Sequence, residues 1–316
     1  MNEIKSVAII GAGALGLLYA QPIAQKIGEK CYFLADGSRY GKIKDGRFTI
    51  NGKSEHFTVV SVDSLTHGLV EKPDFIIVAV KNYHLEEIVG LLDAAVGDNT
   101  LIISVLNGLD SEAFLQRHCP MASVLSSVAI GMDAVKLGRD LSFTSPGRLL
   151  IGSPDNEKKN PALGRLSSFL DECQIAYDVP DDIQRSLWWK LMINIGMNQV
   201  SAVTGANYGL FHTDRNVQQL MEAAMQETID VAKAAGVDLR DDDIPNWYPI
   251  LNSLGADKKT SMLQDIESER KTEVQWFSGR LVEIAGQYGI DVPVNRTLFQ
   301  IIKAKERLYG GASRPA

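Results

Sequence analysis

A glycine-rich loop directly after an apolar run limits most strongly what this chain can fold into. Residues 7–10 read Val-Ala-Ile-Ile, and residues 11–16 read Gly-Ala-Gly-Ala-Leu-Gly. The pattern from Ala14 onward predicts a helix that ends near Ile27. A short buried strand that turns through closely spaced glycines into a helix is the arrangement that binds the pyrophosphate of a dinucleotide. Because 27 glycines could produce this spacing by chance, the prediction depends on the strand before the loop and the helix after it.

Each glycine of the loop has its own physical reason. Gly11 permits the tight turn, Gly13 lets the backbone approach a pyrophosphate, and Gly16 allows close packing of the helix on the strand. The helix N-terminus adds backbone N–H donors and positive potential. A plain glycine-rich turn is the alternative interpretation. If the loop binds a dinucleotide, we expect the contacts to come from Gly11, Ala12, Gly13, Ala14, Leu15 and Gly16.

Further apolar runs predict the fold of the first half of the chain. Residues 31–34, 75–80 and 101–106 are mainly apolar, and helical stretches separate them. Strands that are buried on both faces of a parallel sheet have this pattern. Between Phe48 and Val62 the sequence instead predicts short hairpin strands around Asn51-Gly52. We therefore expect an α/β domain with a Rossmann-type parallel sheet.

Strand-like runs disappear from about Asp182, and the rest of the chain reads as helices. Helices are predicted from residues 181–182 onward, over residues 214–235, after residue 261 and over residues 295–308. We place the boundary near Val179-Pro180. The sequence therefore predicts a dinucleotide-binding domain over residues 1–179 and an all-α substrate and catalytic domain over residues 180–316.

Composition argues against several other classes of protein. The net charge is −7, and the basic residues form no long run that would indicate a nucleic-acid-binding surface. The apolar stretches fall short of the ~20 residues that span a bilayer, and the N-terminus does not resemble a signal peptide. Three widely spaced cysteines form no metal-ligand pattern, so no metal is expected. We expect a cytoplasmic protein that binds neither nucleic acid nor membrane.

The acidic residue at the end of the second predicted strand bears on the choice of cofactor. Asp36 lies twenty residues after Gly16, where a carboxylate bonds the ribose hydroxyls of NAD and repels the 2′-phosphate of NADP. Arg39 follows three residues later and is able to pair with such a phosphate. Asp36 is also compatible with a simple turn at Asp36-Gly37. The residues themselves leave NADH and NADPH both open.

Polar residues follow two other predicted strands. Lys81 comes after the run at 75–80, and Asn107 comes after the run at 101–106. Side chains just past the carboxyl ends of strands in an open α/β sheet line the ligand crevice. Both residues are therefore candidates for contact with a nicotinamide or a substrate. The alternatives are an exposed lysine and ordinary Asn-Gly turn chemistry.

A polar stripe interrupts the apolar segment that spans residues 187–198. Lys190, Asn194 and Asn198 recur every four residues, so they share one face of a helix. Polar groups within such an apolar helix must find partners or face a cavity. A desolvated lysine there would suit the general acid that protonates a developing alkoxide. A partly exposed helix with a hydrated polar edge is the alternative.

Two later residues are ambiguous from spacing alone. Ser261-Met-Leu-Gln264 has the form of a capping box, so Ser261 is equally well explained as a helix cap. Glu273 lies beside Arg270 and Lys271, a pattern that also fits a solvated ion-pair cluster. On one straight helix, Ser261 and Glu273 would point about 120° apart. Spacing therefore assigns neither residue to a site.

Taken together, these segments resemble the ketopantoate reductase family over nearly the full length. The resemblance is carried by residues 11–16, Val80-Lys81, Asn107-Gly108, Trp189-Lys190 with Asn194 and Asn198, residues 261–265 with Thr272-Glu273, and residues 289–295.

The resemblance implies NADPH-dependent reduction of 2-ketopantoate to pantoate, a step of pantothenate and coenzyme A biosynthesis. It implies Lys190 as the catalytic acid and Glu273 as the residue that binds substrate and orients the reacting groups. Asn194, Asn198 and Ser261 would bind the substrate's polar groups. Lys81 and Asn107 would serve the cofactor and its junction with substrate. The expected partner is a small keto-acid substrate, and the resemblance is compatible with a homodimer.

Three positions depart from the family's pattern. Asp36 stands where an arginine for the NADP phosphate is common, Asp110 replaces a usual glycine, and Lys258 replaces an asparagine of some members. Lys258 would either add positive charge at the substrate carboxylate or point to water. Asp36 and Lys258 motivate an alternative, a related reductase of another 2-keto or 3-hydroxy acid with NADH. A non-catalytic dinucleotide-binding protein is the third hypothesis.

Overall fold

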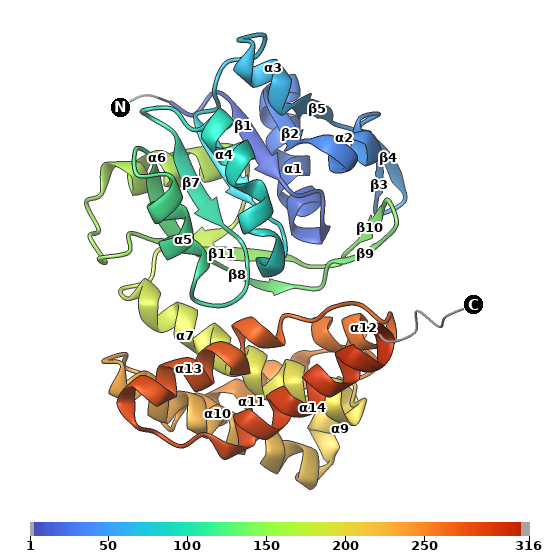
Figure 1. The fold of residues 1–316 in the computed structure, drawn as a ribbon, viewed down its shortest axis with the longest axis vertical. Coiled ribbons are helices and arrows are strands. Elements are labelled where there is room, and N and C mark those ends of the chain that lie inside the picture. Colours follow the sequence, from blue (N-terminus) through green and yellow to red (C-terminus); the bar gives the residue numbers. More distant parts are fainter. Residues whose placement is uncertain (1–2, 311–316) are drawn as a thin grey trace. The chain divides into compact units, whose positions relative to one another are not determined.

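The computed structural model describes residues 3–310, and the chain divides into two compact units, Met1–Ser186 and Leu187–Ala316 (Figure 1). We call them the N-terminal unit and the C-terminal unit and describe each by itself. The division falls inside helix α7 (Ile183–Ile193), a short distance after the boundary expected near Val179-Pro180. Across the described residues, none of the helices combines the length and the apolar character needed to span a bilayer.

An eight-stranded sheet forms the centre of the N-terminal unit, in the order β12-β11-β8-β7-β6-β1-β2-β5. All neighbouring strands pair in parallel except β8 and β11. The predicted parallel sheet is therefore confirmed, and the apolar runs of the sequence form four adjacent strands within it, β7, β6, β1 and β2. The strands are β1 (Val7–Ile10), β2 (Cys31–Ala35), β5 (Thr58–Ser61), β6 (Phe75–Val78), β7 (Leu101–Ser104), β8 (Ser123–Met132), β11 (Pro146–Gly152) and β12 (Tyr177–Asp178).

The predicted hairpin belongs to a second, four-stranded sheet. It has the order β4-β3-β10-β9, with β3 (Arg47–Ile50), β4 (Lys53–His56), β9 (Val135–Leu137) and β10 (Asp140–Ser142). Asn51 and Gly52 both have positive φ at its turn, 48° and 78°, as a type I′ hairpin requires. The hairpin prediction is confirmed, but the segment after it, β5, instead joins β2 in the large sheet.

Helices cover both faces of the large sheet. One apolar core joins the sheet to α1, α6 and the small sheet, and a second core joins it to α3, α4 and α5. Because both faces are covered, the middle strands are buried at every position, which explains their continuous apolar runs. The helices of this unit are α1 (Ala14–Ile27), η1 (Gly28–Lys30), α2 (Gly37–Ile43), α3 (Val62–Thr66), η2 (Asn82–His84), η3 (Glu86–Ile88), α4 (Val89–Ala95), α5 (Ser111–His118) and α6 (Pro161–Glu172).

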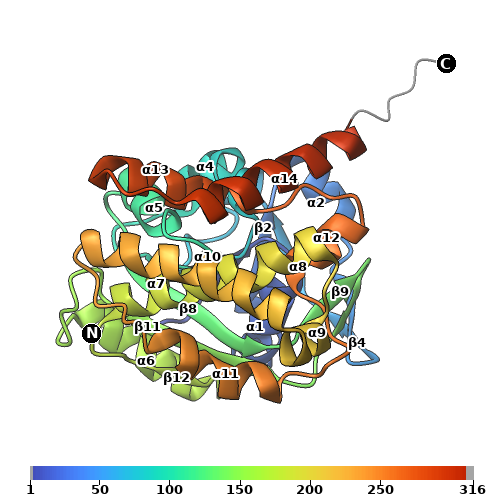
Figure 2. The same ribbon diagram turned by 90° about the horizontal axis from the view of Figure 1, so that it is seen from below.

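The C-terminal unit is helical over its described residues, as predicted (Figure 2). Its long helix begins after Asp214, whose carboxylate accepts hydrogen bonds from the backbone N–H groups of Asn216 and Val217 at 2.9 and 3.0 Å. The elements after α7 are η4 (Asn194–Gln199), α8 (Val200–Thr204), α9 (Tyr208–Thr213), α10 (Arg215–Ala234), α11 (Asp243–Ser253), α12 (Ser261–Glu267), η5 (Val274–Trp276), α13 (Ser278–Tyr288) and α14 (Pro293–Gly310).

One element of this unit has an uncommon form. Residues Asn194–Gln199, continuous with α7 before and α8 after, form a π-helix. A π-helix is wider than an α-helix because its backbone N–H groups bond five residues back, and such turns occur frequently at functional sites. Helix α10 packs directly against this turn. The polar stripe predicted from the sequence therefore stands partly on α-helix and partly on π-helix.

Candidate active site

The glycine loop has the backbone geometry that its spacing predicts. Gly11 has φ of 112°, and a Cβ there would lie 2.6 Å from the carbonyl oxygen of Ala79. A Cβ on Gly16 would lie only 1.9 Å from the carbonyl oxygen of Gly11, so helix α1 needs glycine there to pack on the loop. At Gly13, the N-cap of α1, the nearest atom to a Cβ is the Ala79 oxygen at 3.6 Å. Unlike its neighbours, Gly13 is therefore not required by close contacts within the protein.

The loop also lies at the right place in the sheet. Strand β1 is flanked by β2 on one side and β6 on the other, so the strand order reverses beside it. In open α/β sheets, ligands bind past the carboxyl ends of strands at such a reversal. Ala12, Ala14 and Leu15 lie there with the three glycines, at the end of β1 and the start of α1.

Asp36 and Arg39 follow the carboxyl end of β2. Asp36 is the N-cap of α2, and its Oδ1 accepts a hydrogen bond from the backbone N–H of Gly37 at 2.7 Å. Arg39, in the first turn of α2, forms an ion pair with Glu87, and a nitrogen of its guanidinium lies 2.8 Å from Nδ1 of His84. The hydrogen bond from His84, with the charges of His84 and Arg39, keeps the pKa of Glu87 below its ordinary value. The guanidinium of Arg39 is therefore already engaged.

Lys81 and Asn107 follow the neighbouring strands β6 and β7, as expected. Lys81 begins the turn into η2, and its neighbour Asn82 is buried. The side-chain N–H of Asn82 donates to the carbonyl oxygen of Asn107 at 2.8 Å and so links the two turns. The sequence interpretation overlooked Asn82, although its position directly after Lys81 was a usable signal. Lys81 and Asn107 thus lie at one edge of the sheet.

Lys190 and Glu273 interact within the C-terminal unit. Lys190 is the half-buried eighth residue of α7, and burial lowers its pKa to about 8. Glu273 opposes this shift because its negative charge favours the ammonium form of the lysine. Glu273 precedes η5 and is only 4% exposed. A lysine and a glutamate 83 positions apart in sequence (273 − 190) are therefore electrostatic neighbours.

The π-helix brings Asn194 and Asn198 together with Ser261. The side-chain N–H of Asn198 donates to Oδ1 of Asn194 at 2.9 Å, and the Ser261 hydroxyl donates to Oδ1 of Asn198 at 3.3 Å. Both asparagines are only 8% exposed. Within the described part of the protein, the buried Nδ2 of Asn194 meets no hydrogen-bond acceptor. A buried donor without an acceptor costs about 1–3 kcal/mol, which marks this as a place for a ligand oxygen.

Ser261 is not the helix cap that the capping-box pattern suggested. Thr260 is the N-cap of α12, and its hydroxyl oxygen accepts a hydrogen bond from the backbone N–H of Leu263 at 3.2 Å. The pattern is shifted by one residue because threonine and serine are adjacent, and either hydroxyl is able to cap. The Ser261 side chain therefore remains available to the asparagine pair.

Glu273 is likewise not part of a solvated ion-pair cluster, since it is buried. Arg270 pairs instead with Asp265, Nε to Oδ1 at 2.9 Å. The carboxylate of Glu306, on α14, accepts hydrogen bonds from the backbone N–H and the hydroxyl of Thr272 at 2.8 and 2.6 Å. Since Thr272 precedes Glu273, this contact fixes the backbone that presents the glutamate. Helix α12 has already ended at Glu267, so Ser261 and Glu273 do not share one helix.

The other two departures from the family pattern lie on loops or helix ends. Lys258 is exposed, which fits the expectation that its side chain points to water. Asp110 is the residue before α5.

Glu112, two residues after Asp110, was not singled out from the sequence. Burial raises the pKa of Glu112 to about 7, although hydrogen bonds, including one from the Ser111 hydroxyl at 2.9 Å, lower it. An acidic residue in the first turn of a helix after Asn107-Gly108 was the available signal.

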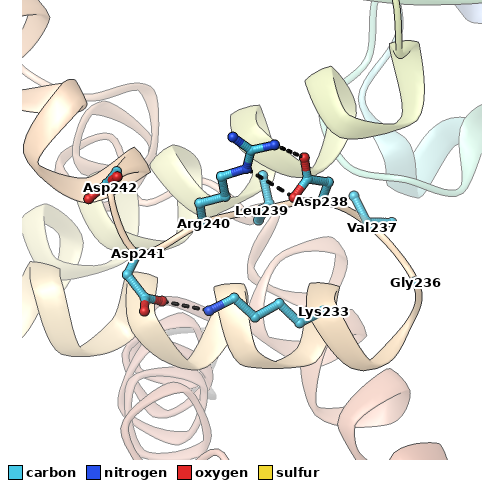
Figure 3. A pocket seen from close by; sticks show the side chains of 8 residues that line it. All are labelled: Lys233, Gly236, Val237, Asp238, Leu239, Arg240, Asp241 and Asp242. Atoms are coloured by element: carbon cyan, nitrogen blue, oxygen red, sulfur yellow. Dashed lines mark hydrogen bonds and ion pairs between the residues drawn. The ribbon is translucent and has the colours of Figure 1, made fainter.

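A surface pocket in the C-terminal unit is lined by none of the candidate site residues. It surrounds the loop after α10, and Figure 3 shows its lining side chains. Lys233 pairs with Asp241 at 2.7 Å, and Arg240 pairs with Asp238 at 2.5 Å, so its cations already have partners. It contains no candidate catalytic group. Within the described residues, His, Cys, Asp and Glu side chains form no group of three or more that is able to hold a metal ion.

Comparison with known proteins identifies the family of the chain. Residues 7–156 match the family described as ketopantoate reductase PanE/ApbA, and residues 182–306 match ketopantoate reductase PanE/ApbA C terminal. The 2-dehydropantoate 2-reductase of Aquifex aeolicus is 27% identical over 312 residues, 96% of this chain and 97% of the relative. That of Archaeoglobus fulgidus is 26% identical and covers 96% of this chain and 99% of its own.

Solved structures show the same fold. A dimeric ketopantoate reductase from Staphylococcus aureus superposes with a TM-score of 0.82 at 22% identity and covers 96% of this chain and all of its own. D-mandelate dehydrogenase with NADH and anilino(oxo)acetate has a TM-score of 0.84 at 20% identity and covers 96% and 99%. The chain therefore belongs to the ketopantoate reductase family and is an NAD(P)H-dependent oxidoreductase acting on a CH–OH group.

Proposed function

We propose that this enzyme reduces the keto group of a 2-keto acid, with 2-dehydropantoate as the leading substrate and Lys190 as the general acid. The observation that carries the proposal is the lowered pKa of Lys190, about 8, beside the buried carboxylate of Glu273. With that pKa the lysine is still an ammonium at neutral pH, yet it releases its proton more readily than an exposed lysine. General acids work best when their pKa lies near the working pH.

The residues of the C-terminal unit have complementary tasks in this reaction. When bound, the nicotinamide cofactor supplies a hydride to the keto carbon. Lys190 donates its proton to the keto oxygen as negative charge develops there, and Glu273 keeps the lysine protonated until then. The free side-chain N–H groups of Asn194 and Asn198 bind substrate oxygens, and Ser261, whose proton goes to Asn198, offers its oxygen as an acceptor to a substrate hydroxyl. Nδ2 of Asn194 thereby gains the acceptor that the described residues do not provide.

The residues of the N-terminal unit fit a dinucleotide. Gly13 stands at the start of α1 without a close contact that requires glycine, which suits approach by a pyrophosphate. Ala12, Ala14 and Leu15 complete the loop that would surround it. Lys81 and Asn107 would contact the nicotinamide end, because Lys81 follows β6, the neighbour of β1, and Asn107 follows β7, the next strand along, to which Asn82 links it.

We further propose that NADH is preferred to NADPH. A carboxylate at Asp36 favours ribose hydroxyls and repels a 2′-phosphate. Capping of α2 uses one oxygen of Asp36, so the second oxygen is the one assigned to the ribose. Arg39, the cation nearest to Asp36 along the chain, is paired with Glu87 and lies against His84. The family resemblance implies NADPH, but its 2′-phosphate would have to compete with the carboxylate of Glu87 for that guanidinium.

The direct test is oxidation of NADH and NADPH in parallel, with 2-dehydropantoate and a panel of other 2-keto acids. Turnover of 2-dehydropantoate above all other acids is the expected result. Higher kcat/KM for another acid would reject the leading substrate. Cofactor binding without turnover of any keto acid would reject the reductase and favour a non-catalytic dinucleotide-binding protein.

The cofactor proposal has its own test in Glu87→Gln. Removing this carboxylate frees the charge of Arg39, so the affinity for NADPH should rise up to about fivefold, as the modest strength of exposed ion pairs suggests. The affinity for NADH should not change. The matched control is Glu86→Gln, an exposed neighbour on the same turn. Equal effects of the two substitutions, measured by titration of each cofactor, would refute the role of Glu87.

A second candidate function is an NADH-linked reductase of a different 2-keto acid. It is favoured by Asp36 together with the likeness to D-mandelate dehydrogenase with bound NADH and anilino(oxo)acetate. An aromatic 2-keto acid in the panel separates this candidate from the first.

We also propose a homodimer, because the Staphylococcus aureus relative is described as dimeric. Sedimentation equilibrium would measure the mass directly, and a monomer would reject this part.

A further inference from the structure

The last residue of the π-helix makes hydrogen bonds that hold the turn itself. Gln199 is fully buried, and its side-chain N–H donates to the carbonyl oxygen of Ile195 at 3.2 Å. In a π-helix the backbone N–H groups bond five residues back, so the regular pairing with the carbonyl four residues back is lost. A side-chain donor to a carbonyl inside the turn compensates for this loss. Gln199 is therefore a local support of the π-helix.

Gln199 is also tied to two helices distant in sequence. Its Oε1 accepts a hydrogen bond from the backbone N–H of Ser278, on α13, at 3.2 Å. Its Nε2 donates to Oδ1 of Asn295, on α14, at 3.4 Å, and the Ser278 hydroxyl donates to the same oxygen at 2.8 Å. All three side chains are fully buried. These three residues, which we call the buried amide network, thus connect the π-helix to α13 and α14.

Helix α10 fixes the far end of the network. The side-chain N–H of Asn295 donates to the carbonyl oxygen of Ala224 at 3.0 Å and to Oε2 of Glu227 at 2.9 Å. Glu227 also accepts from the backbone N–H groups of Val294 and Asn295, at 2.8 and 2.9 Å, and so caps α14. Both polar side-chain atoms of Asn295 thus have partners, as a rigid buried network requires.

The same helix packs closely on the backbone of the π-helix. A Cβ on Gly196 would lie 2.6 Å from Cγ of Met225 and 3.1 Å from Cγ of Met221. Met225 and Met221 are fully buried, so they have little room to withdraw. The π-helix is therefore held by apolar contact at Gly196 and by hydrogen bonds at Gln199.

We infer that Gln199 is a positioning residue for substrate binding, because the buried amide network fixes the π-helix on which Asn194 and Asn198 stand. This inference rests on the proposed function, in which those two asparagines bind the keto acid. The hydrogen bonds of the Gln199 side chain go to other residues than Asn194, Asn198 and Ser261. Loss of these side-chain hydrogen bonds leaves buried groups of Ser278 and Asn295 short of a partner, and the turn is no longer held in place. Asn198 then moves relative to Ser261.

The test is Gln199→Met, which keeps the length of the side chain and removes its hydrogen bonds. We expect the KM for the keto acid to rise about tenfold, kcat to change less than about threefold, and the Kd of the cofactor to stay constant. Ser278→Ala removes only the hydroxyl bond to Asn295 and should raise KM about twofold to threefold. This milder variant keeps the inference testable if Gln199→Met does not fold.

Ser201→Ala is the matched control. Ser201 is fully buried in α8, directly after the π-helix, and its hydroxyl donates to the carbonyl oxygen of Ala206 at 2.6 Å. Its loss should lower the melting temperature without changing KM. If Gln199→Met and Ser201→Ala raise KM equally, or neither raises it, the inference is overturned.

A measurement without turnover separates this inference from the proposed function. In protein labelled with [15N]asparagine, the side-chain resonances of Asn194 and Asn198 are assigned by substituting each residue with alanine. Both should shift in Gln199→Met and stay in place in Ser201→Ala. Unmoved resonances would overturn the positioning role. Absence of turnover in the unsubstituted enzyme would overturn only the proposed function.

Discussion

Lys190 keeps its proton at neutral pH because two influences on its ammonium group oppose each other. Burial lowers its pKa, and the nearby carboxylate of Glu273 raises it, which leaves the value at about 8. Without the carboxylate, desolvation alone would take the pKa lower still. The glutamate therefore controls the pH range in which the lysine is able to act as an acid.

We predict that Glu273→Gln moves the pH dependence of the reaction. The pKa of Lys190 should fall below about 8, so the decline of kcat/KM for keto-acid reduction with rising pH should begin at lower pH. The profile is measured from pH 5 to pH 10 with saturating cofactor. If the descending limb stays at the pH of the unsubstituted enzyme, Glu273 does not control the lysine.

Glu112 gives a second, opposite pH effect, on stability. Its pKa in the folded state is raised from 4.5 to about 7, which corresponds to roughly 3 kcal/mol at most. A carboxyl group with a raised folded-state pKa stabilises the fold below its unfolded pKa, and this contribution is lost as the pH rises through about 7. Glu112→Gln removes the ionisation. Between pH 5 and pH 8, the melting temperature of this variant should rise relative to that of the unsubstituted protein. The exposed Glu86→Gln is the control and should show no such rise. Equal pH dependence of the two melting temperatures would contradict the raised pKa of Glu112.

Among elements, the junction of β1 and α1 has little tolerance for change. We predict that Gly16→Ala destabilises the fold by about 1–3 kcal/mol or more, because its Cβ would lie 1.9 Å from the carbonyl oxygen of Gly11. Gly164, exposed in α6 with open space around it, is the matched control. Gly164→Ala should stabilise the protein by about 0.5–1 kcal/mol. Calorimetry of both variants measures the contrast, and two similar melting temperatures would disprove it.

Elements with a strong local pattern were predictable from the sequence. Strands β7, β6, β1 and β2, helix α1 and the helix after Asp214 all appear where the apolar period and the capping residue indicated. Strand β8 was missed because its buried positions include Ser126 and Ser127, whose polarity hides the apolar run. The π-helix was not predicted, because side chains that recur every four residues share one face of the helix whether it is α-helical or contains a single π-turn.

The candidate site was predictable only in its parts. Lys190, Asn194 and Asn198 follow from one local stripe, and the structure joins two of them by a hydrogen bond. The interaction of Lys190 with Glu273, by contrast, depends on how chain segments far apart in sequence fold together. Neighbouring residues with the same chemistry left the cap of α12 ambiguous, since Thr260 caps the helix where the sequence pattern also allowed Ser261. Long-range contacts and the choice between adjacent hydroxyls are not encoded in local pattern.

At the scale of the whole molecule, the two units carry different parts of the proposed reaction. The glycine loop, Asp36 and Arg39 belong to the N-terminal unit, and Lys190 and Glu273 belong to the C-terminal unit. Binding of the cofactor and proton donation to the substrate should therefore be separable by substitution.

We predict that Lys190→Ala lowers kcat by 10²–10⁴-fold, the usual contribution of general acid catalysis, while the Kd of the cofactor is unchanged. Stopped-flow turnover and fluorescence titration of the reduced cofactor measure the two quantities. Lys305→Ala is the control, since this half-buried lysine of the same unit donates to the carbonyl oxygen of Ala202 at 2.8 Å instead. Unchanged turnover in Lys190→Ala would remove the lysine from the mechanism.

The π-helix Asn194–Gln199 also bears on how this enzyme is able to change in evolution. A π-turn accommodates one residue more than the α-helix around it, so it marks a place where a single insertion is absorbed without loss of the flanking helix. Deletion of one codon there would restore a regular helix and rotate the upstream lysine by about 100° relative to the downstream segment. A one-residue length change would thus rearrange Lys190 relative to Asn198 in a single step, where point substitutions would need several.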